Sequence, residues 1–305
     1  MSSPPPGSWS APDVPVLVRR RAALLGASGR AWLAGLEDTL AELERRWSFT
    51  VRHPLAGGSA AAVYSVRLVE GTAVLKVPLP DDDGAEARLL ERASGRGYVR
   101  LLRRDARSGA VLLEALGASL ADEREPPDTQ ALVLADLLQR AWLRPDPSQA
   151  SPAAVAWKAE SLAAFVREAG ADAPRRVLET ALRCADARVA AADPARAVVV
   201  HGDPHAGNAL RAPEGGYRFI DPDGFVCEPE YDLGVLVRER GVHDGASVEE
   251  VGTLCRLLAG RTGLDERAVR EWAALERVTT GLLYRRLGEH EQAERWLSAA
   301  ARSPW

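Results

Sequence analysis

Lysine and asparagine are almost missing from this sequence. Lys and Arg together number 39 among the 305 residues, and only two of these, Lys76 and Lys158, are lysine. Asn208 is the single asparagine. Because the chain uses Arg wherever positive charge alone is needed, a Lys or Asn that lies within a motif is expected to do chemistry that Arg, Asp or Gln cannot do.

Cysteine, long apolar runs and an excess of positive charge are also lacking. Cys184, Cys227 and Cys255 are spaced widely and irregularly, which favours buried free thiols over a disulfide framework or a zinc site. A formal net charge of −4 removes the electrostatic signature of a dedicated nucleic-acid binder. Since no apolar run approaches a membrane span, the sequence predicts a cytoplasmic protein with a small-molecule partner and neither a nucleic-acid nor a membrane partner.

Hydrophobic periodicity divides the chain into four parts. The Pro- and Ser-rich residues 1–14 are predicted to be disordered, and residues 15–48 carry a helical period that is interrupted at Gly35. Residues 49–116 contain five strand-like segments and a short helix, which predicts a small antiparallel lobe with one helix. Residues 117–305 are mostly helical, with two short strands that each run into a loop rich in Asp and Gly. The predicted fold class is therefore α+β.

These two loops, HGDPHAGN and IDPDG, hold the residues with the clearest chemistry. Mg²⁺ prefers oxygen ligands, and the amide of Asn208 with the carboxylate of Asp221 forms a minimal set. Asp203 then stays free of metal to accept a hydrogen bond from a hydroxyl group and orient it for attack on a phosphoryl group. The alternative is that all three are turn residues. Their joint occurrence, with the only Asn among them, favours phosphoryl transfer.

Lys76 provides independent support for phosphate binding. It lies in the apolar strand AVLKV, on the same side as Val74, where a compact ammonium can reach phosphate oxygens. Glu86 shares a predicted helix face with Leu89 and Leu90, so it is expected to point inward and hold the lysine. A lysine that extends from an edge strand into solvent is the alternative.

A glycine-rich segment, AGGSAAAV, separates the first two strands of the predicted lobe. It contains Gly57, Gly58 and Ser59, and glycine lets backbone N–H groups approach phosphate oxygens. A plain hairpin turn explains the same residues equally well, because the segment has neither a GxGxxG pattern nor a P-loop lysine. Its position beside the Lys76 strand favours nucleotide binding.

Four tryptophans, Trp142, Trp157, Trp272 and Trp296, fall at apolar positions of predicted helices and are predicted to lie in the core. Lys158 follows Trp157 in the middle of a helix. It is predicted to be solvated, without a functional role.

Together, these motifs resemble the aminoglycoside phosphotransferase family. The resemblance is carried by HGDPHAGN, by IDPDG with Asp221 eighteen residues after Asp203, and by the VLKV strand followed by a short helix with an inward Glu. GRAWLAGLEDTLAELERRW further resembles the branch that contains streptomycin 6-phosphotransferases and hydroxyurea phosphotransferases. The resemblance implies a bilobal protein-kinase-like fold, ATP and Mg²⁺ as cofactors, and transfer to a hydroxyl group of a small molecule.

The resemblance also implies roles for individual residues. Asp203 matches the catalytic Asp, and Asn208 and Asp221 match the magnesium ligands. Lys76, paired to Glu86, matches the lysine that contacts the α- and β-phosphates.

Further positions match supporting parts of the family's site. Glu114 to Leu116 match the segment whose backbone meets adenine, and His205 stands where it can touch the transferred phosphate. His201 is expected to hydrogen-bond the catalytic loop, and Asp232 matches a buried Asp that braces this loop.

The acceptor implied by the resemblance is a cationic aminoglycoside, with streptomycin first. Glu228 and Glu230 closely follow IDPDG, the loop that carries Asp221 and that we call the metal loop. They are predicted to bind the cationic groups of the acceptor. Asp223 departs from the family pattern, in which a basic or neutral residue is common, and adds negative charge near the metal. Two alternatives are a kinase acting on hydroxyurea or a small metabolite, and a nucleotide-binding pseudokinase that serves as an interaction module. The sequence carries no signal of oligomeric state.

Overall fold

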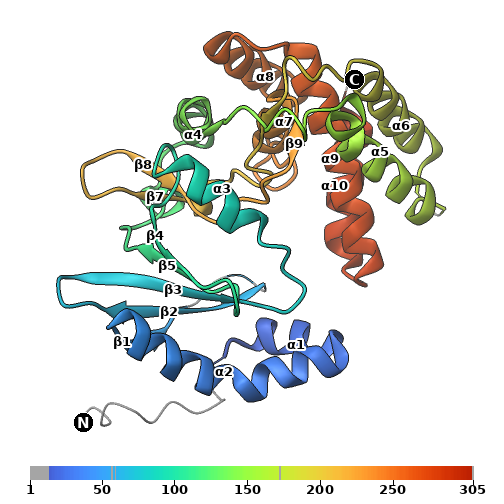
Figure 1. Ribbon diagram of the computed structural model, residues 1–305. Helices are drawn as coiled ribbons and strands as arrows, with labels where there is room; N and C mark the ends of the chain where they lie inside the picture. Colours follow the sequence, from blue (N-terminus) through green and yellow to red (C-terminus); the bar gives the residue numbers. More distant parts are fainter. Residues whose placement is uncertain (1–13, 56–57, 59, 172, 304–305) are drawn as a thin grey trace. The chain divides into compact units, whose positions relative to one another are not determined.

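A computed structural model describes residues 14–303 except 56, 57, 59 and 172 (Figure 1). By the clustering of its contacts, the chain forms two compact units. The first consists of Met1–Gly95 and Val99–Leu116, and the second of Arg96–Tyr98 and Gly117–Trp305. Residues 1–13, most of the segment predicted to be disordered, lie outside the described residues.

The first unit begins with two helices, α1 (Val16–Leu24) and α2 (Gly26–Trp47). The predicted interruption at Gly35 is wrong, because α2 runs through this residue without a break. A single glycine in a helix costs only about 1 kcal/mol, which the packing of α2 outweighs. The break falls instead at Gly26, whose φ of +64° is a left-handed conformation that glycine adopts without strain.

The first unit contains a five-stranded antiparallel sheet in the order β1-β2-β3-β5-β4. Its strands are β1 (Thr50–Pro54), β2 (Ala61–Arg67), β3 (Thr72–Pro78), β4 (Leu101–Arg104) and β5 (Val111–Glu114). The apolar residues of α1 and α2 form one core with alternate residues of these strands, including Val18, Leu36, Leu40, Leu43, Trp47, Tyr64, Val66, Leu75 and Val77. The predicted small antiparallel sheet is confirmed.

Side chains alternate along β3, so this core also determines where Lys76 points. Leu75 and Val77 are buried in the core with α2, and Lys76 between them projects from the other face of the sheet. The single helix that follows the strand, α3 (Ala85–Ala93), buries Leu89 and Leu90. Among the described residues between 49 and 116, α3 is the one α-helix, as predicted, whereas the unit as a whole also includes α1 and α2.

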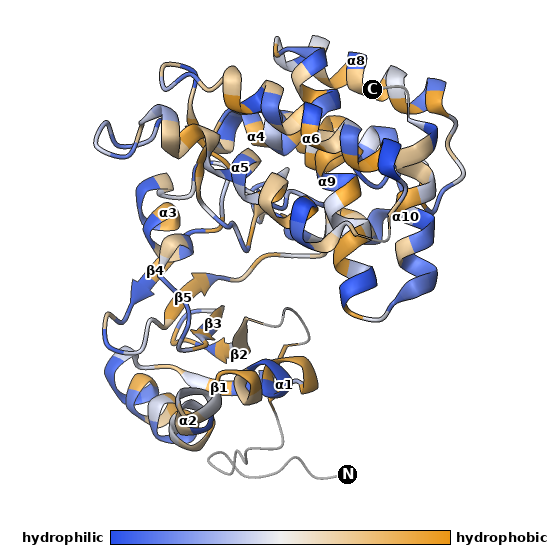
Figure 2. Cartoon of the chain, turned by 90° about the vertical axis from the view of Figure 1, so that its right-hand side faces the viewer, coloured by the Kyte–Doolittle hydropathy of each residue, from blue (hydrophilic) through white to orange (hydrophobic). Residues whose placement is uncertain are grey.

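The second unit is mainly helical. Its helices are α4 (Pro127–Ala141), α5 (Pro152–Ala169), α6 (Arg175–Ala190), α7 (Glu230–Val237), α8 (Val248–Thr262), α9 (Glu266–Arg286) and α10 (His290–Arg302). α9 contacts α5, α6, α7, α8 and α10, and is the central helix of the unit (Figure 1). Hydrophobic and hydrophilic residues alternate along these helices (Figure 2), as expected when one face of each helix is buried.

Short strands interrupt the helical unit and position its loops. β6 (Val198–Val199) pairs with β9 (Val226–Cys227), and β7 (Ala209–Arg211) pairs with β8 (Tyr217–Phe219). Two single-turn helices, η2 (Leu120–Glu123) and η3 (Ala206–Asn208), accompany them. The segment 200–205 therefore leaves β6, and the segment 220–225 leads into β9, the strand that pairs with β6. Across the residues that the structure describes, we find no helix that combines the length and hydrophobicity required to cross a membrane.

Candidate active site

The loop that begins at His201 is held by a buried carboxylate at the start of α7. Asp232 has no exposed surface and accepts hydrogen bonds from the backbone N–H groups of His201 (2.8 Å) and Gly202 (2.9 Å). Trp142 donates its indole Nε1–H to the same carboxylate at 2.8 Å. Burial raises the pKa of Asp232 to about 6, and the three donors partly offset this effect. The group is therefore mostly ionised at neutral pH, as three N–H donors require.

His201 connects this loop to the segment that contains Asp221. Its ring is fully buried, and burial lowers its pKa to about 4, so the imidazole is neutral. Nδ1 accepts the backbone N–H of Asp203 at 3.1 Å. The proton must then lie on Nε2, which donates to the carbonyl oxygen of Ile220 at 3.0 Å. Protonation of Nδ1 would remove one of these two links.

The low pKa of His201 predicts a specific loss of stability in acid. In the unfolded chain the imidazole takes up a proton near pH 6.5, and in the folded chain only near pH 4. Its contribution is therefore fully present above pH 6.5 and is lost as the pH falls toward 4, by roughly 3 kcal/mol. Urea unfolding of wild type and His201→Gln at several pH values measures it. The stability difference between them should shrink by this amount.

A matched control for that experiment is His290→Gln, at an exposed position in the first turn of α10. It removes a histidine without removing a buried hydrogen bond. If the stability difference between wild type and His201→Gln does not change with pH, His201 is not the neutral acceptor described above.

Asp203 is the only carboxylate within the loop 201–208, and it faces a guanidinium that the sequence analysis missed. Its side chain is 39% exposed. Oδ1 accepts a hydrogen bond from Nη2 of Arg238 at 2.7 Å, whereas Oδ2 lies 3.6 Å from Nε2 of His205. Arg238 follows directly after α7, the helix that carries Asp232. The carboxylate is thus oriented from one side and open to solvent on the other.

Asn208 and Asp221 are brought together by the backbone. The amide Nδ2 of Asn208 donates to the carbonyl oxygen of Asp203 at 3.1 Å, which directs the planar amide's oxygen the other way. The carbonyl oxygen of Asn208 accepts the N–H of Ile220 at 2.9 Å, so Asp221 follows immediately after a residue bonded to Asn208. Asp221 adopts a left-handed φ of +54°, and such strain in a non-glycine residue is common at functional sites.

The donor set around these two residues fits Mg²⁺. Asn208 and Asp221 supply a neutral and an anionic oxygen, and Mg²⁺ characteristically binds one or two such protein groups together with phosphate and water. Among the described residues, no three His, Cys, Asp or Glu side chains group closely enough to form a metal site.

Asp223 packs against Gly202 in the loop 201–208. A Cβ atom added to Gly202, whose φ is +95°, would lie 2.6 Å from Asp223 Cβ, so only glycine fits there. The backbone N–H of Asp223 donates to the carbonyl oxygen of His201 at 2.7 Å. Desolvation raises the pKa of the Asp223 carboxyl above its ordinary value, and the positive charge of Lys158 opposes this shift. The departure from the family pattern thus places a second carboxyl group beside the loop.

His205 lies at the start of η3, with its side chain half exposed. Its Nδ1 accepts the N–H of Gly207 at 3.1 Å, which holds the ring beside Asp203. A contact between His205 and a transferred phosphate remains a prediction.

In the first unit, Lys76 and Glu86 form an ion pair. Nζ of Lys76 lies 2.5 Å from Oε2 of Glu86, and both side chains are largely buried, at 13% and 18% exposed. The position of Lys76 on the sheet face away from the α2 core explains this contact. A lysine that extends into solvent from an edge strand is excluded, because β3 lies between β2 and β5.

Other positions predicted to bind nucleotide are less informative. Glu114, at the end of β5, accepts the N–H of Arg100 with Oε1 at 2.7 Å, and Leu116 is partly buried two residues later. Gly58 is exposed, whereas Gly57 and Ser59 lie outside the described residues. Contacts of these residues with nucleotide remain predictions.

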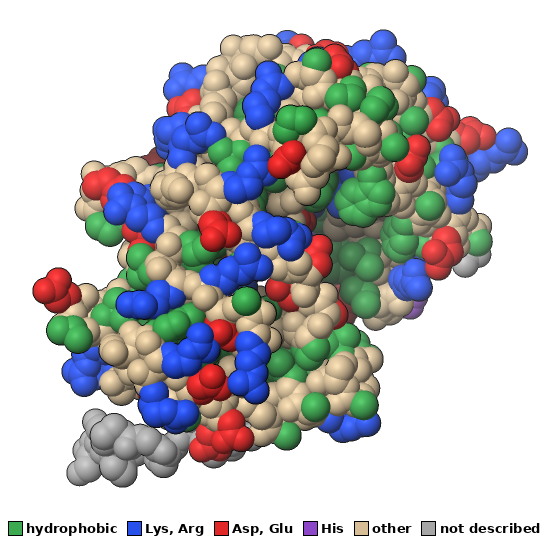
Figure 3. Space-filling view, viewed as in Figure 1, with side chains coloured by type: hydrophobic (Ala, Val, Ile, Leu, Met, Phe, Trp, Pro, Cys, Tyr) green, Lys and Arg blue, Asp and Glu red, His purple; other side chains and the backbone are tan. Residues whose placement is uncertain are grey.

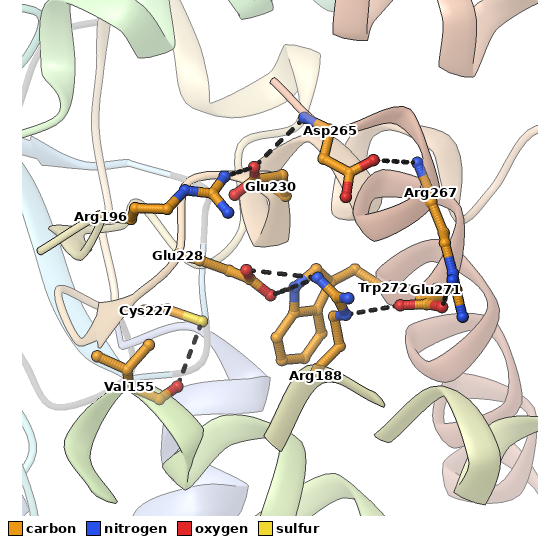
Figure 4. A network of polar contacts seen from close by, with 10 residues as sticks. All are labelled: Val155, Arg188, Arg196, Cys227, Glu228, Glu230, Asp265, Arg267, Glu271 and Trp272. Atoms are coloured by element: carbon orange, nitrogen blue, oxygen red, sulfur yellow. Dashed lines mark hydrogen bonds and ion pairs between the residues drawn. The ribbon is translucent and has the colours of Figure 1, made fainter. Parts of the chain in front are cut away.

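The prediction that Glu228 and Glu230 bind the acceptor is wrong. Both residues are buried, and Figure 4 shows their carboxylates within a network of arginines. Glu228 pairs with Arg188 at 3.3 Å and accepts the indole N–H of Trp272 at 2.7 Å. Glu230 pairs with Arg196. The prediction relied on their proximity to the metal loop in sequence. It failed because the chain enters the interior at β9 and buries both residues.

Two further predictions, on neighbouring residues of α5, are also wrong. Trp157 is 51% exposed and not part of the core, and it packs edge-on against Phe225 with ring centroids 5.7 Å apart. Lys158 is not solvated: its side chain is only 20% exposed, and Nζ lies 3.9 Å from Oε1 of Glu276. The rarity of lysine, which indicated a functional role for Lys76, could have indicated one for Lys158 as well. Arg238 had no such signal, because arginine is common in this chain.

The chain is similar in sequence to known proteins. The sequence model of the family described as aminoglycoside/hydroxyurea antibiotic resistance kinase matches residues 46–288. A hydroxyurea phosphotransferase of Kitasatospora aureofaciens is 35% identical over 268 residues, covering 85% of this chain and 76% of that protein. A streptomycin 6-kinase of Streptomyces glaucescens is 32% identical over 259 residues, covering 81% and 82%.

Among solved structures, the chain is similar to an aminoglycoside phosphotransferase of Streptomyces rimosus in complex with ADP and streptomycin. The TM-score is 0.52 at 21% sequence identity, and the match covers 79% of this chain and 97% of that chain. This likeness shows a shared protein-kinase-like fold.

Proposed function

Because the chain belongs to the aminoglycoside/hydroxyurea antibiotic resistance kinase family, we propose that it transfers the γ-phosphoryl group of ATP, in the presence of Mg²⁺, to a hydroxyl group of streptomycin. The observation that carries this proposal is the environment of Asp203. Its carboxylate is oriented by Arg238 and accessible to solvent, on the same loop as Asn208. A cationic aminoglycoside acceptor would make the protein an antibiotic resistance kinase.

Asp203 accepts a hydrogen bond from the acceptor hydroxyl and takes its proton. The hydroxyl oxygen forms a bond to the γ-phosphorus while the bond from that phosphorus to the β–γ bridging oxygen breaks, and ADP leaves. The proton passes from Asp203 to water. Arg238 holds the carboxylate at one oxygen, Oδ1, and this leaves Oδ2 for the hydroxyl group.

Mg²⁺ bound to the oxygens of Asn208 and Asp221 would supply charge neutralisation on the phosphates. Lys76 would add a second positive charge, on the α- and β-phosphates, and Glu86 fixes the lysine rotamer. Catalysis then comes chiefly from positioning and electrostatics. Since ATP and Mg²⁺ are abundant in the cytoplasm, we expect the enzyme to act there.

The acceptor contacts must come from residues other than Glu228 and Glu230. Trp157 offers an exposed aromatic face, and it packs on Phe225, two residues after Asp223. An aromatic face attracts guanidinium and ammonium groups. The exposed carboxyl of Asp223 offers a complementary charge. Acidic and basic side chains are intermingled on the surface seen in Figure 3, without one dominant sign of charge. Individual side chains such as Trp157 and Asp223 would therefore decide acceptor binding.

The acceptor is tested by ADP release from wild type with ATP and Mg²⁺ in the presence of streptomycin, other aminoglycosides or hydroxyurea. Streptomycin should stimulate turnover most. Trp157→Ala should then raise the KM for streptomycin about 5- to 10-fold and leave the KM for ATP unchanged, because a cation–aromatic contact contributes about 1 kcal/mol. Trp157→Phe, which keeps an aromatic face, is the matched control.

Each alternative has its own outcome in this assay. Stimulation by hydroxyurea alone would replace streptomycin as the acceptor while leaving the chemistry intact. Nucleotide binding without stimulation by any acceptor would favour the pseudokinase interpretation.

A further inference from the structure

Lys158 holds its charge in an unusual position for a lysine. Its Nζ lies over the ring of Phe225, 5.1 Å from the centroid, and over the ring of Tyr231 at 5.4 Å. Glu276 Oε1 lies 3.9 Å from the same nitrogen. Two aromatic faces and a carboxylate thus replace most of the water around the ammonium group. A lysine that only made the protein soluble would not be placed in this way.

Glu276, on α9, is the partner that links Lys158 to the rest of the site. The residue is buried, and its Oε1 also accepts the hydroxyl of Tyr231 at 2.6 Å. Its Oε2 lies 3.5 Å from Nη1 of Arg238. A buried carboxylate is stable only when neighbouring charges and donors compensate it. Lys158 and Arg238 provide the two positive charges that do so.

Arg238 is shared between two carboxylates. Nη1 faces Glu276, and Nη2 donates to Oδ1 of Asp203 at 2.7 Å. Its backbone is fixed as well, because its carbonyl oxygen accepts the Nε–H of Arg277 at 2.9 Å. Charges of alternating sign therefore run from α5 through α9 to the catalytic loop, in the order Lys158, Glu276, Arg238 and Asp203. We refer to these four residues as the charge chain.

From this arrangement we propose that Lys158 is a positioning residue for phosphoryl transfer: it compensates Glu276 so that Arg238 remains bound to Asp203. This inference rests on the proposed function, in which Asp203 accepts the hydrogen bond of the acceptor hydroxyl group. Without Lys158, Glu276 would keep its negative charge in a buried position with only one cation nearby. Arg238 is that cation, and it would move toward Glu276 and away from Asp203. The carboxylate of Asp203 would then lose the contact that orients it.

The decisive variant is Lys158→Met, which keeps a long unbranched side chain against Phe225 and removes the charge. It should lower kcat about 10- to 100-fold, because displacement of a reacting group by about 1 Å can cost that much. The KM for ATP should stay within about twofold. Lys158→Arg, which restores the charge, should recover most of the lost kcat. Arg167→Met, on the opposite face of α5, is the matched control and should stay within about twofold of wild type.

A second variant separates positioning from a general packing defect. In Lys158→Met/Glu276→Gln, the neutral amide no longer attracts Arg238, so kcat should be higher than in Lys158→Met alone. A structural role for Lys158 predicts the reverse, because each substitution would weaken the same packing. The proposal is overturned if Lys158→Met turns over at the wild-type rate, or if the double variant is no faster than the single one.

Crystal structures of wild type and Lys158→Met provide a readout that does not depend on activity. In the variant, Arg238 should approach Glu276 and leave Asp203. If wild type phosphorylates no acceptor but Arg238 moves in this way, the proposed function fails and the charge chain stands. If Arg238 stays on Asp203, the inference fails whatever the activity of wild type.

Discussion

Asp203→Asn should lower kcat for phosphoryl transfer about 10²- to 10⁴-fold, the range expected when a general base is removed. An amide oxygen can still accept the hydrogen bond from Arg238, so the loop should keep its geometry. The amide cannot take the proton of the acceptor hydroxyl. The loss should therefore fall on kcat, with the KM for ATP within about twofold of wild type. Steady-state ADP release with saturating acceptor measures both constants.

Asp186→Asn, on an exposed face of α6, is the matched control for this substitution. It removes a carboxylate of the same chemistry outside the catalytic loop, and its activity should equal that of wild type. If Asp203→Asn retains more than about a tenth of wild-type kcat, Asp203 is not the group that accepts the proton. The intact loop would then be a binding feature, as in the pseudokinase interpretation.

Lys76→Met should produce the second large loss, about 10²-fold in kcat/KM for ATP. The ammonium would stabilise charge on the phosphates, and a single such contact in a preorganised site is characteristically worth 10²- to 10³-fold. Lys76→Arg should not restore activity, because the planar guanidinium is bulkier and differs in shape from an ammonium group. Glu86→Gln should reduce activity in the same direction by a smaller factor, since it releases the lysine without removing it.

Arg67→Met, at an exposed position at the end of β2, controls for loss of positive charge from the same sheet. Thermal unfolding of each variant checks that the sheet is intact. An active Lys76→Met variant with an unchanged KM for ATP would contradict the role of the ion pair in nucleotide binding. The Asp203 and Lys76 results are independent, because the two residues belong to different units.

Much of the fold and part of the site could be predicted from local patterns. The period of two along the strand placed Lys76 on the same side as Val74, and the helical period placed Glu86 on the same face as Leu89 and Leu90. Both patterns depend on backbone geometry over a few residues, which tertiary contacts rarely change. The ion pair of 2.5 Å follows from them.

Among the predictions that failed, two were based on nearness in sequence and one on the apolar period of a helix. Glu228 and Glu230 lie a few residues after the metal loop, but β9 and α7 carry them into the interior, where Arg188 and Arg196 neutralise them. Trp157 follows the apolar period of its helix, yet α5 leaves it half exposed beside Phe225. In each case the outcome depended on which elements pack nearby, and periodicity carries no information about that.

The sequence by itself determined the candidate site of this protein: the loop that carries Asp203, the oxygens that would suit a metal, and the strand and helix that bring Lys76 and Glu86 together. These features arise within short segments, where spacing and residue type decide the result. Only the tertiary structure decided which partners the charged groups have. Arg238 reaches Asp203 from 35 residues away, and Lys158 reaches Glu276 from another helix. A buried charge requires an opposite charge nearby, and it pairs with the one that packing places within reach. Packing depends on the whole chain, so the sequence pattern of a short segment does not reveal this partner.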